Sequence, residues 1–95
     1  MSQDKYCDRW VDVKDWCEKN GFDPDKRYDE EEAPYKRGVQ KSFALKHKEL
    51  DHYVSVQCDS DYDWGESAFT IFTERQLRVE VPVTTVQIKY VKADV

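Results

Sequence analysis

The stretch Asp4–Gly21, DKYCDRWVDVKDWCEKNG, decides the fold because apolar residues recur in it at helical spacing. They stand at i, i+4, i+7 and i+11, which places them in one narrow stripe along a helix. We therefore predict a helix over residues 3–20 whose stripe packs on the rest of the domain. The residues of this predicted stripe are Tyr6, Trp10, Val13 and Cys17.

The ends of the predicted helix are marked by capping residues. Ser2 is the expected N-cap, and Asn20-Gly21 supplies a residue that tolerates the left-handed conformation in which many helices end. Phe22 should pack back on the last turn, and Pro24 prevents the helix from resuming. A second side of the helix is acidic and is expected to face water or a partner. Its acidic residues are Asp4, Asp8, Asp15 and, less centrally, Asp12 and Glu18.

Length and charge limit the classes of function. The 95 residues are enough for one domain, residues 1–95, built from two packed layers. The formal net charge is −5, and residues 51–66 hold five acids and no base. Direct binding to nucleic acid or to an anionic membrane requires a basic patch, so neither is expected. A protein partner with a basic surface is predicted instead.

The cysteines indicate the compartment. Cys7, Cys17 and Cys58 make an odd number without CxxC spacing, and neither a cleavable signal peptide nor a span of about 18 apolar residues is expected. On one continuous helix, Cys7 and Cys17 would stand about 15 Å apart, too far for a disulfide. Reduced, buried thiols and a cytoplasmic location are predicted.

Residues 23–38, DPDKRYDEEEAPYKRG, carry no apolar period and hold two prolines. This composition is typical of a connecting loop, and the run of four acids in its middle, Asp29–Glu32, is expected to be solvated. The segment is predicted to be an acidic connection between the helix and a sheet.

From residue 39 to residue 92 the apolar period changes from 3.6 to 2, which predicts an antiparallel sheet. Keeping the apolar residues on one face fixes the expected register of each hairpin. The first hairpin pairs His47 with His52, Leu45 with Val54, Phe43 with Val56 and Lys41 with Cys58. A second hairpin turns at 74–76 and joins SAFTIFTE to LRVEV. The last pairs Val81 with Val86, Val79 with Ile88 and Leu77 with Tyr90.

The predicted fold class is therefore α+β, with one N-terminal amphipathic helix packed on a meander of about five antiparallel strands.

Two patterns resemble parts of metal sites. His47 and His52 would be cross-strand neighbours, but spacing assures no third ligand. The segment Asp59–Gly65, DSDYDWG, resembles the start of an EF-hand loop, yet its glycine is one place late and Thr70 stands where the last ligand should be glutamate. We predict no metal and no cofactor.

An enzyme is not expected, because the chain lacks a GxSxG motif, a glycine-rich phosphate loop and a defensible Cys-His pair. The predicted function is a small acidic inhibitor, of the phage-encoded, immunity or antitoxin kind, that blocks a basic and nucleic-acid-handling protein by imitating a polyanion. The alternative is a non-catalytic assembly protein that dimerises through its sheet, with Tyr53 and Phe72 exposed.

The residues expected to bind the partner combine carboxylates with aromatic side chains. Trp64 is ranked first because it stands in a turn where no strand register buries it. The acidic helix side comes second and Asp29–Glu32 third. The expected binding residues are Asp59, Asp61, Tyr62, Asp63, Trp64 and Glu66, then Asp4, Asp8, Asp12 and Asp15, then Asp29, Glu30, Glu31 and Glu32.

Overall fold

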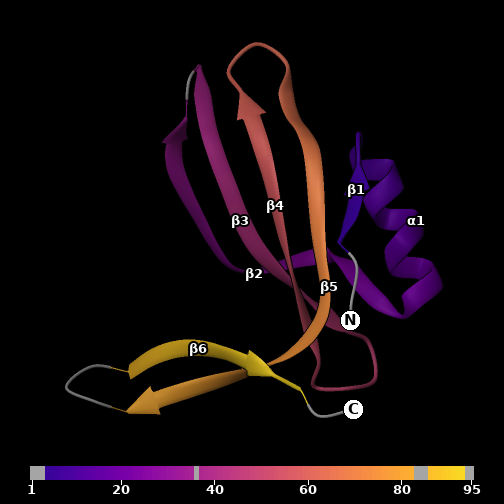
Figure 1. Ribbon diagram of the computed structural model, residues 1–95, viewed down its shortest axis with the longest axis vertical. Coiled ribbons are helices and arrows are strands. Elements are labelled where there is room, and N and C mark those ends of the chain that lie inside the picture. Colours follow the sequence, from indigo (N-terminus) through magenta and orange to yellow (C-terminus); the bar gives the residue numbers. More distant parts are fainter. Residues whose placement is uncertain (1–3, 36, 83–85, 94–95) are drawn as a thin grey trace.

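The computed structural model describes residues 4–35, 37–82 and 86–93 (Figure 1). In this part of the chain one helix packs on an antiparallel sheet of six strands, so the α+β prediction is confirmed. The elements in chain order are β1 (Lys5–Cys7), α1 (Trp10–Asn20), β2 (Phe22–Tyr35), β3 (Gly38–His47), β4 (Tyr53–Asp61), β5 (Gly65–Pro82) and β6 (Val86–Lys92).

The sheet has the strand order β1-β5-β4-β3-β2, and β6 pairs with the second half of β5. Figure 1 shows that β5 bends after it leaves β4, so that the end of β5 and β6 form an arm below the main sheet. The turns that join β2 to β3 and β4 to β5 lie together at the opposite end of the sheet, since Gly38 pairs with Asp61.

The core lies between α1 and one face of the sheet. Val13 and Cys17 are fully buried there, and the ring of Trp10 packs on Phe43 and Phe69 at centroid distances of 6.1 and 5.4 Å. The predicted stripe is thus correct from Trp10 onward. The buried core cluster comprises Cys7, Val13, Cys17, Phe22, Phe43, Leu45, Val54, Val56, Cys58, Phe69 and Ile71.

The predicted helix start is wrong. The helix begins at Trp10, and the preceding residues form β1, in which Cys7 pairs with Phe69 of β5. Strand pairing buries Cys7 and leaves Tyr6 60% exposed, so Tyr6 does not belong to the core stripe. The backbone bonds to β5 and the burial of Cys7 outweigh the helical period of these few residues, because so short a helical segment is marginal by itself. The expected N-cap, Ser2, lies outside the described residues.

The predicted helix end is confirmed. Gly21 is left-handed at φ 83°, and its N–H bonds to the carbonyl of Cys17. A Cβ at Gly21 would lie 2.5 Å from the imidazole of His47, so both conformation and space favour glycine. Phe22 then turns inward and stacks on Trp16 at a centroid distance of 5.4 Å.

The sequence predicted a loop for residues 23–38, and this prediction is wrong. Most of these residues form strand β2 at the edge of the sheet. The register of β2 shifts twice, once on each side of Tyr28, and Asp29 has a positive φ of 52°. These bulges break the apolar alternation that identifies a strand, which is why the sequence pattern resembles a connection. The edge position also accommodates prolines, because their missing N–H removes no inner ladder bond.

The first hairpin has the predicted register, with Leu45 opposite Val54 and Phe43 opposite Val56. The N–H of His47 bonds to the carbonyl of His52 at 2.8 Å, which confirms the expected pair at its end.

The hairpin predicted at 74–76 does not exist, because β5 runs unbroken from Gly65 to Pro82. The last hairpin differs from the prediction by one residue, since Val79 pairs with Lys89 and Leu77 with Val91. This register sets Arg78 opposite Tyr90, and both side chains then bind Asp29 of β2. The predicted register relied on apolar alternation alone. The observed register instead goes with a polar contact to a residue far away in the chain.

Candidate interaction surface

The turn between β4 and β5 consists of Tyr62, Asp63 and Trp64, here called the aromatic turn. It is closed by an Asp61 carboxylate oxygen that accepts the N–H of Asp63 at 2.7 Å, and by Gly65 in the left-handed conformation at φ 78°. Aspartate and glycine favour these two positions because one bonds locally to the backbone and the other tolerates positive φ. Local chemistry therefore fixes the shape of the aromatic turn.

The two aromatic side chains of this turn face solvent. Trp64 is 87% exposed and Tyr62 is 81% exposed, more than any other large hydrophobic side chain in the described ranges. The predicted exposure of Trp64 is confirmed, and the ring does not fold back on the sheet. Two exposed rings beside carboxylates resemble the aromatic, polar-rimmed clusters that carry much of the binding energy in protein interfaces.

The neighbouring β2–β3 turn extends this surface. Tyr35 is 41% exposed, and a hollow of about 340 Å³ separates it from the end of β4. Asp59 and Asp61 both line the hollow, as do Arg37, Gly38 and Ser67. Tyr35 is not among the expected binding residues, although its place one residue after Pro34 and three before Gly38 is typical of a hairpin turn. The structure thus brings Asp59, Asp61, Tyr62, Asp63 and Trp64 to one end of the sheet.

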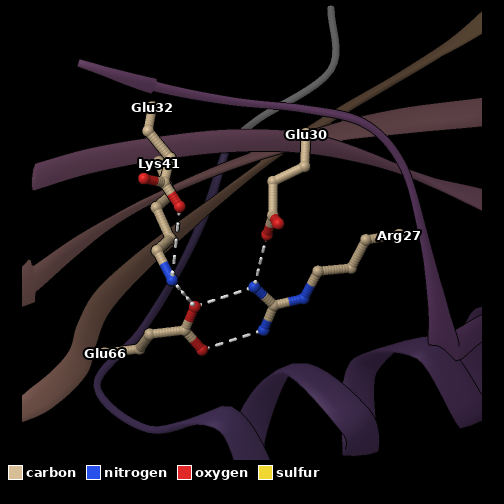
Figure 2. A network of polar contacts seen from close by, with 5 residues as sticks. All are labelled: Arg27, Glu30, Glu32, Lys41 and Glu66. Atoms are coloured by element: carbon tan, nitrogen blue, oxygen red, sulfur yellow. Dashed lines mark hydrogen bonds and ion pairs between the residues drawn. The ribbon is translucent and has the colours of Figure 1, made fainter.

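Glu66 lies apart from this group. Its carboxylate binds the guanidinium of Arg27 through two bonds of 2.7 and 2.9 Å and accepts a third from Lys41 at 3.2 Å (Figure 2). The bond from Arg27 is the main cause that lowers the pKa of Glu66 from 4.5 to about 2. Glu66 is therefore ionised and committed within the chain, which argues against its predicted role in steering a partner.

Arg27 is the centre of this polar network, which we define as Arg27, Glu30, Glu32, Lys41 and Glu66. Its guanidinium lies 4.2 Å from the ring centroid of Phe43 and 4.7 Å from that of Trp10, and it also binds Glu30 at 3.0 Å. The network joins β2, β3 and β5 across the sheet (Figure 2). Partial burial and aromatic contact make such an arginine hard to replace by lysine.

The acidic run of β2 is also largely engaged within the chain. Asp29 binds Arg78 at 2.8 Å and accepts the hydroxyl of Tyr90, and the Arg78 bond is the main cause that lowers the pKa of Asp29. Glu30 binds Arg27, while Glu32 lies 3.9 Å from Lys41. Glu31 is exposed and has no ion-pair partner among residues 4–35, 37–82 and 86–93.

The acids of the N-terminal segment do not form the helical array that was predicted. Asp4 and Asp8 precede α1, whereas Asp12 and Asp15 lie on it. Asp12 stands in the first turn, where a carboxylate stabilises the helix dipole. With Glu18, the acids on α1 number three, and Asp8 lines the same hollow as Asp12 and Asp15 although it precedes the helix.

His47 closes a turn, and the three cysteines are buried. Nδ1 of His47 accepts the N–H groups of Glu49 and Leu50, each at 3.1 Å, and so closes the β3–β4 turn. No cluster of three or more metal-ligating side chains occurs in the described part of the chain. All three cysteines are free and buried, and burial raises the pKa of Cys17 to about 12 and that of Cys58 to about 11.

No protein family, curated protein or solved structure matches this chain. Among the described residues, no helix has the length and apolar character needed to cross a membrane.

Proposed function

We propose that this protein is a non-catalytic binding protein that docks its aromatic turn on a basic surface of another protein and thereby blocks that surface. The exposure of Trp64 is the observation that carries the proposal. The turn leaves the ring in water at a cost in solvation, and a partner that covers it would recover that cost. The carboxylates of Asp61 and Asp63 beside it favour a cationic partner.

The surrounding charge supports the same class of partner. Asp59, Asp61 and Asp63 lie within five residues of one another, and residues 51–66 contain no base. Such a surface attracts a basic protein and repels phosphate backbones. A target that itself handles nucleic acid has the complementary charge, and an inhibitor of the immunity or antitoxin kind would act by covering its binding surface. The reduced, buried cysteines suit a cytoplasmic setting.

The test is affinity capture from the native host with three baits, the wild type, Trp64→Ala and Leu50→Ala. Leu50 is the matched control, because it is 45% exposed in the β3–β4 turn at the other end of the sheet. We expect Trp64→Ala to weaken binding of the captured partner at least about tenfold, or about 1.4 kcal/mol, with Leu50→Ala unchanged.

Two further measurements separate this proposal from loss of fold or of charge alone. The free energy of unfolding of Trp64→Ala should lie within about 0.5 kcal/mol of that of the wild type, because the ring contacts solvent. Asp63→Lys should slow association and reduce its salt dependence between about 50 and 500 mM. Unchanged affinity in Trp64→Ala, or a partner that neither salt nor DNA or RNA displaces, would contradict the proposal.

Self-association through the sheet is the second candidate. Tyr53 was expected to be exposed on the sheet. It is only 8% exposed, because its ring packs between Tyr28 and Tyr90. A different apolar row, Leu77, Val79 and Val91, is 36–38% exposed on the β5–β6 arm. Light scattering tests this candidate. A dimer that forms with rising protein concentration, is insensitive to salt and is abolished by Val79→Lys would favour it.

A further inference from the structure

The sheet face opposite α1 carries a row of small and polar residues. Alternation along β3 and β4 places Phe43, Leu45, Val54 and Val56 under the helix, so their neighbours point the other way. On that open face, Ala44 pairs with Ser55, Ser42 with Gln57 and Gln40 with Asp59. Side chains of this size leave the pleated surface hollow.

Three hollows follow one another along this row. The largest, about 600 Å³, lies against Ala44 and Ser55, with Tyr28 and Tyr90 among its lining residues. The next, about 110 Å³, shares Ser42 and Glu31 with the first. The third is the hollow of about 340 Å³ beside Tyr35 and the aromatic turn, and its Asp59 is directly opposite Gln40 of the second. We call this row of hollows, from Ala44 to Gly38, the trough.

The trough has the length of an extended peptide. From Ala44 to Gly38 it follows β3, which at about 3.4 Å per residue corresponds to about 20 Å or about seven residues of extended chain. Because it lies on the face of inner strands, an occupant would bond to side chains such as Ser42 and Gln57 rather than add a strand to an edge.

The charge of its lining selects the occupant. Asp29, Glu30, Glu32 and Lys41 are paired within the chain. The remaining charged residues of the lining are three acids, Glu31, Asp59 and Asp61, and one base, Arg37. Glu31 and Asp59 are the carboxylates placed along its middle. One wall already accommodates a cation, since Nζ of Lys26 lies 4.7 Å from the ring centroid of Tyr28.

We propose that the trough binds an extended, basic segment of the partner protein, about seven residues long, with Arg or Lys at alternate positions. This inference rests on the proposed function and names the part of the partner that lies beyond the aromatic turn. Alternation places the cationic side chains on the side of the segment that faces Glu31 and Asp59, while its backbone bonds to Ser42 and Gln57.

The test is a titration of the isotope-labelled protein, followed by NMR, with a blocked peptide of about seven residues that alternates Arg and Ser. We expect the largest shift changes at Gly38–Ala44 and Ser55–Asp59. A peptide with Glu in place of Arg should give none. Ser42→Lys and, separately, Gln57→Lys should weaken the Arg peptide at least about tenfold, whereas Val11→Lys adds the same charge on the exposed side of α1 and should leave its affinity within about twofold.

The outcomes distinguish this inference from the proposed function. If the peptide shifts residues outside the trough, or if all three lysine variants weaken it equally, the trough is not its site. If capture of the partner depends on Trp64 but not on Ser42, the proposed function holds and the trough inference fails. If peptide binding depends on Ser42 while Trp64→Ala leaves capture intact, the trough stands and the role of the aromatic turn fails.

Discussion

Two segments that carry carboxylates have opposite surroundings in this protein. In β2, Asp29, Glu30 and Glu32 all lie close to cationic groups of the same chain. In the aromatic turn, Asp63 is exposed beside two exposed rings. The first segment holds the strands of the sheet together, whereas the second presents its charge to whatever approaches the end of the sheet.

This difference shows that the number of carboxylates in a segment does not measure the charge that a partner meets. Asp29 lies at a bulge and is directed to Arg78 and Tyr90, 49 and 61 residues away in the chain. The charge of a carboxylate held in this way is balanced by its ion-pair partner, and the pair contributes to stability. A carboxylate in a tight surface turn keeps its solvation and its charge stays exposed. The following predictions test that division, beginning with the largest effect.

Arg27→Ala should lower the free energy of unfolding by about 2 to 4 kcal/mol, because it leaves Glu66 and Glu30 without their partner and removes the contact with Phe43. Urea denaturation measures this loss. Arg37→Ala, which removes an exposed arginine from the β2–β3 turn, is the matched control and should change stability by less than about 0.5 kcal/mol. Equal losses in the two variants would mean that the polar network does not hold the sheet.

Glu66→Gln should cost about 1 to 2 kcal/mol at neutral pH, because the charge-assisted bonds to Arg27 and Lys41 become weak ones. The folded-state pKa of Glu66 lies at about 2, below the ordinary value of 4.5. Its stabilising contribution is therefore complete above pH 4.5 and is lost as the pH falls from 4.5 toward 2.

Stability measured by urea denaturation across that pH window should fall less steeply in Glu66→Gln than in the wild type. Asp63→Asn is the control, because its carboxylate has no ion-pair partner in the described part of the chain and should leave the slope unchanged. Parallel curves for the wild type and Glu66→Gln would show that Glu66 is not held as an ionised group.

Asp63→Asn should also give the smallest stability change, less than about 0.5 kcal/mol, because only the backbone N–H of this residue takes part in the turn. Asp29→Asn should cost more, about 1 kcal/mol, since it weakens the bonds from Arg78 and Tyr90. Thermal unfolding of the two variants at one pH decides the order. A reversed order would remove the distinction between the two acidic segments.

Part of the site was predictable from sequence because it depends on neighbours in the chain. The exposure of Trp64 followed from a turn rich in Asp and Gly with no strand position for the ring. Glu66 stands only two residues later, yet its place in the polar network depends on Arg27, 39 residues away. Nothing in the local sequence distinguishes a carboxylate that is ion-paired within the chain from one that is solvated. The list of predicted binding residues therefore contained both.

The sequence by itself determined the features that arise within a few residues: the Trp10-Val13-Cys17 stripe, the helix end at Gly21 and the register of the β3–β4 hairpin. Periodicity and turn residues encode these directly, because the interacting groups are near in the chain. Only the tertiary structure decided that residues 5–7 form a strand, that β2 replaces a loop and that β5 continues through 74–76. In each case pairing with a distant strand supplied backbone bonds that outweigh the local preference, and no short stretch of sequence contains both partners.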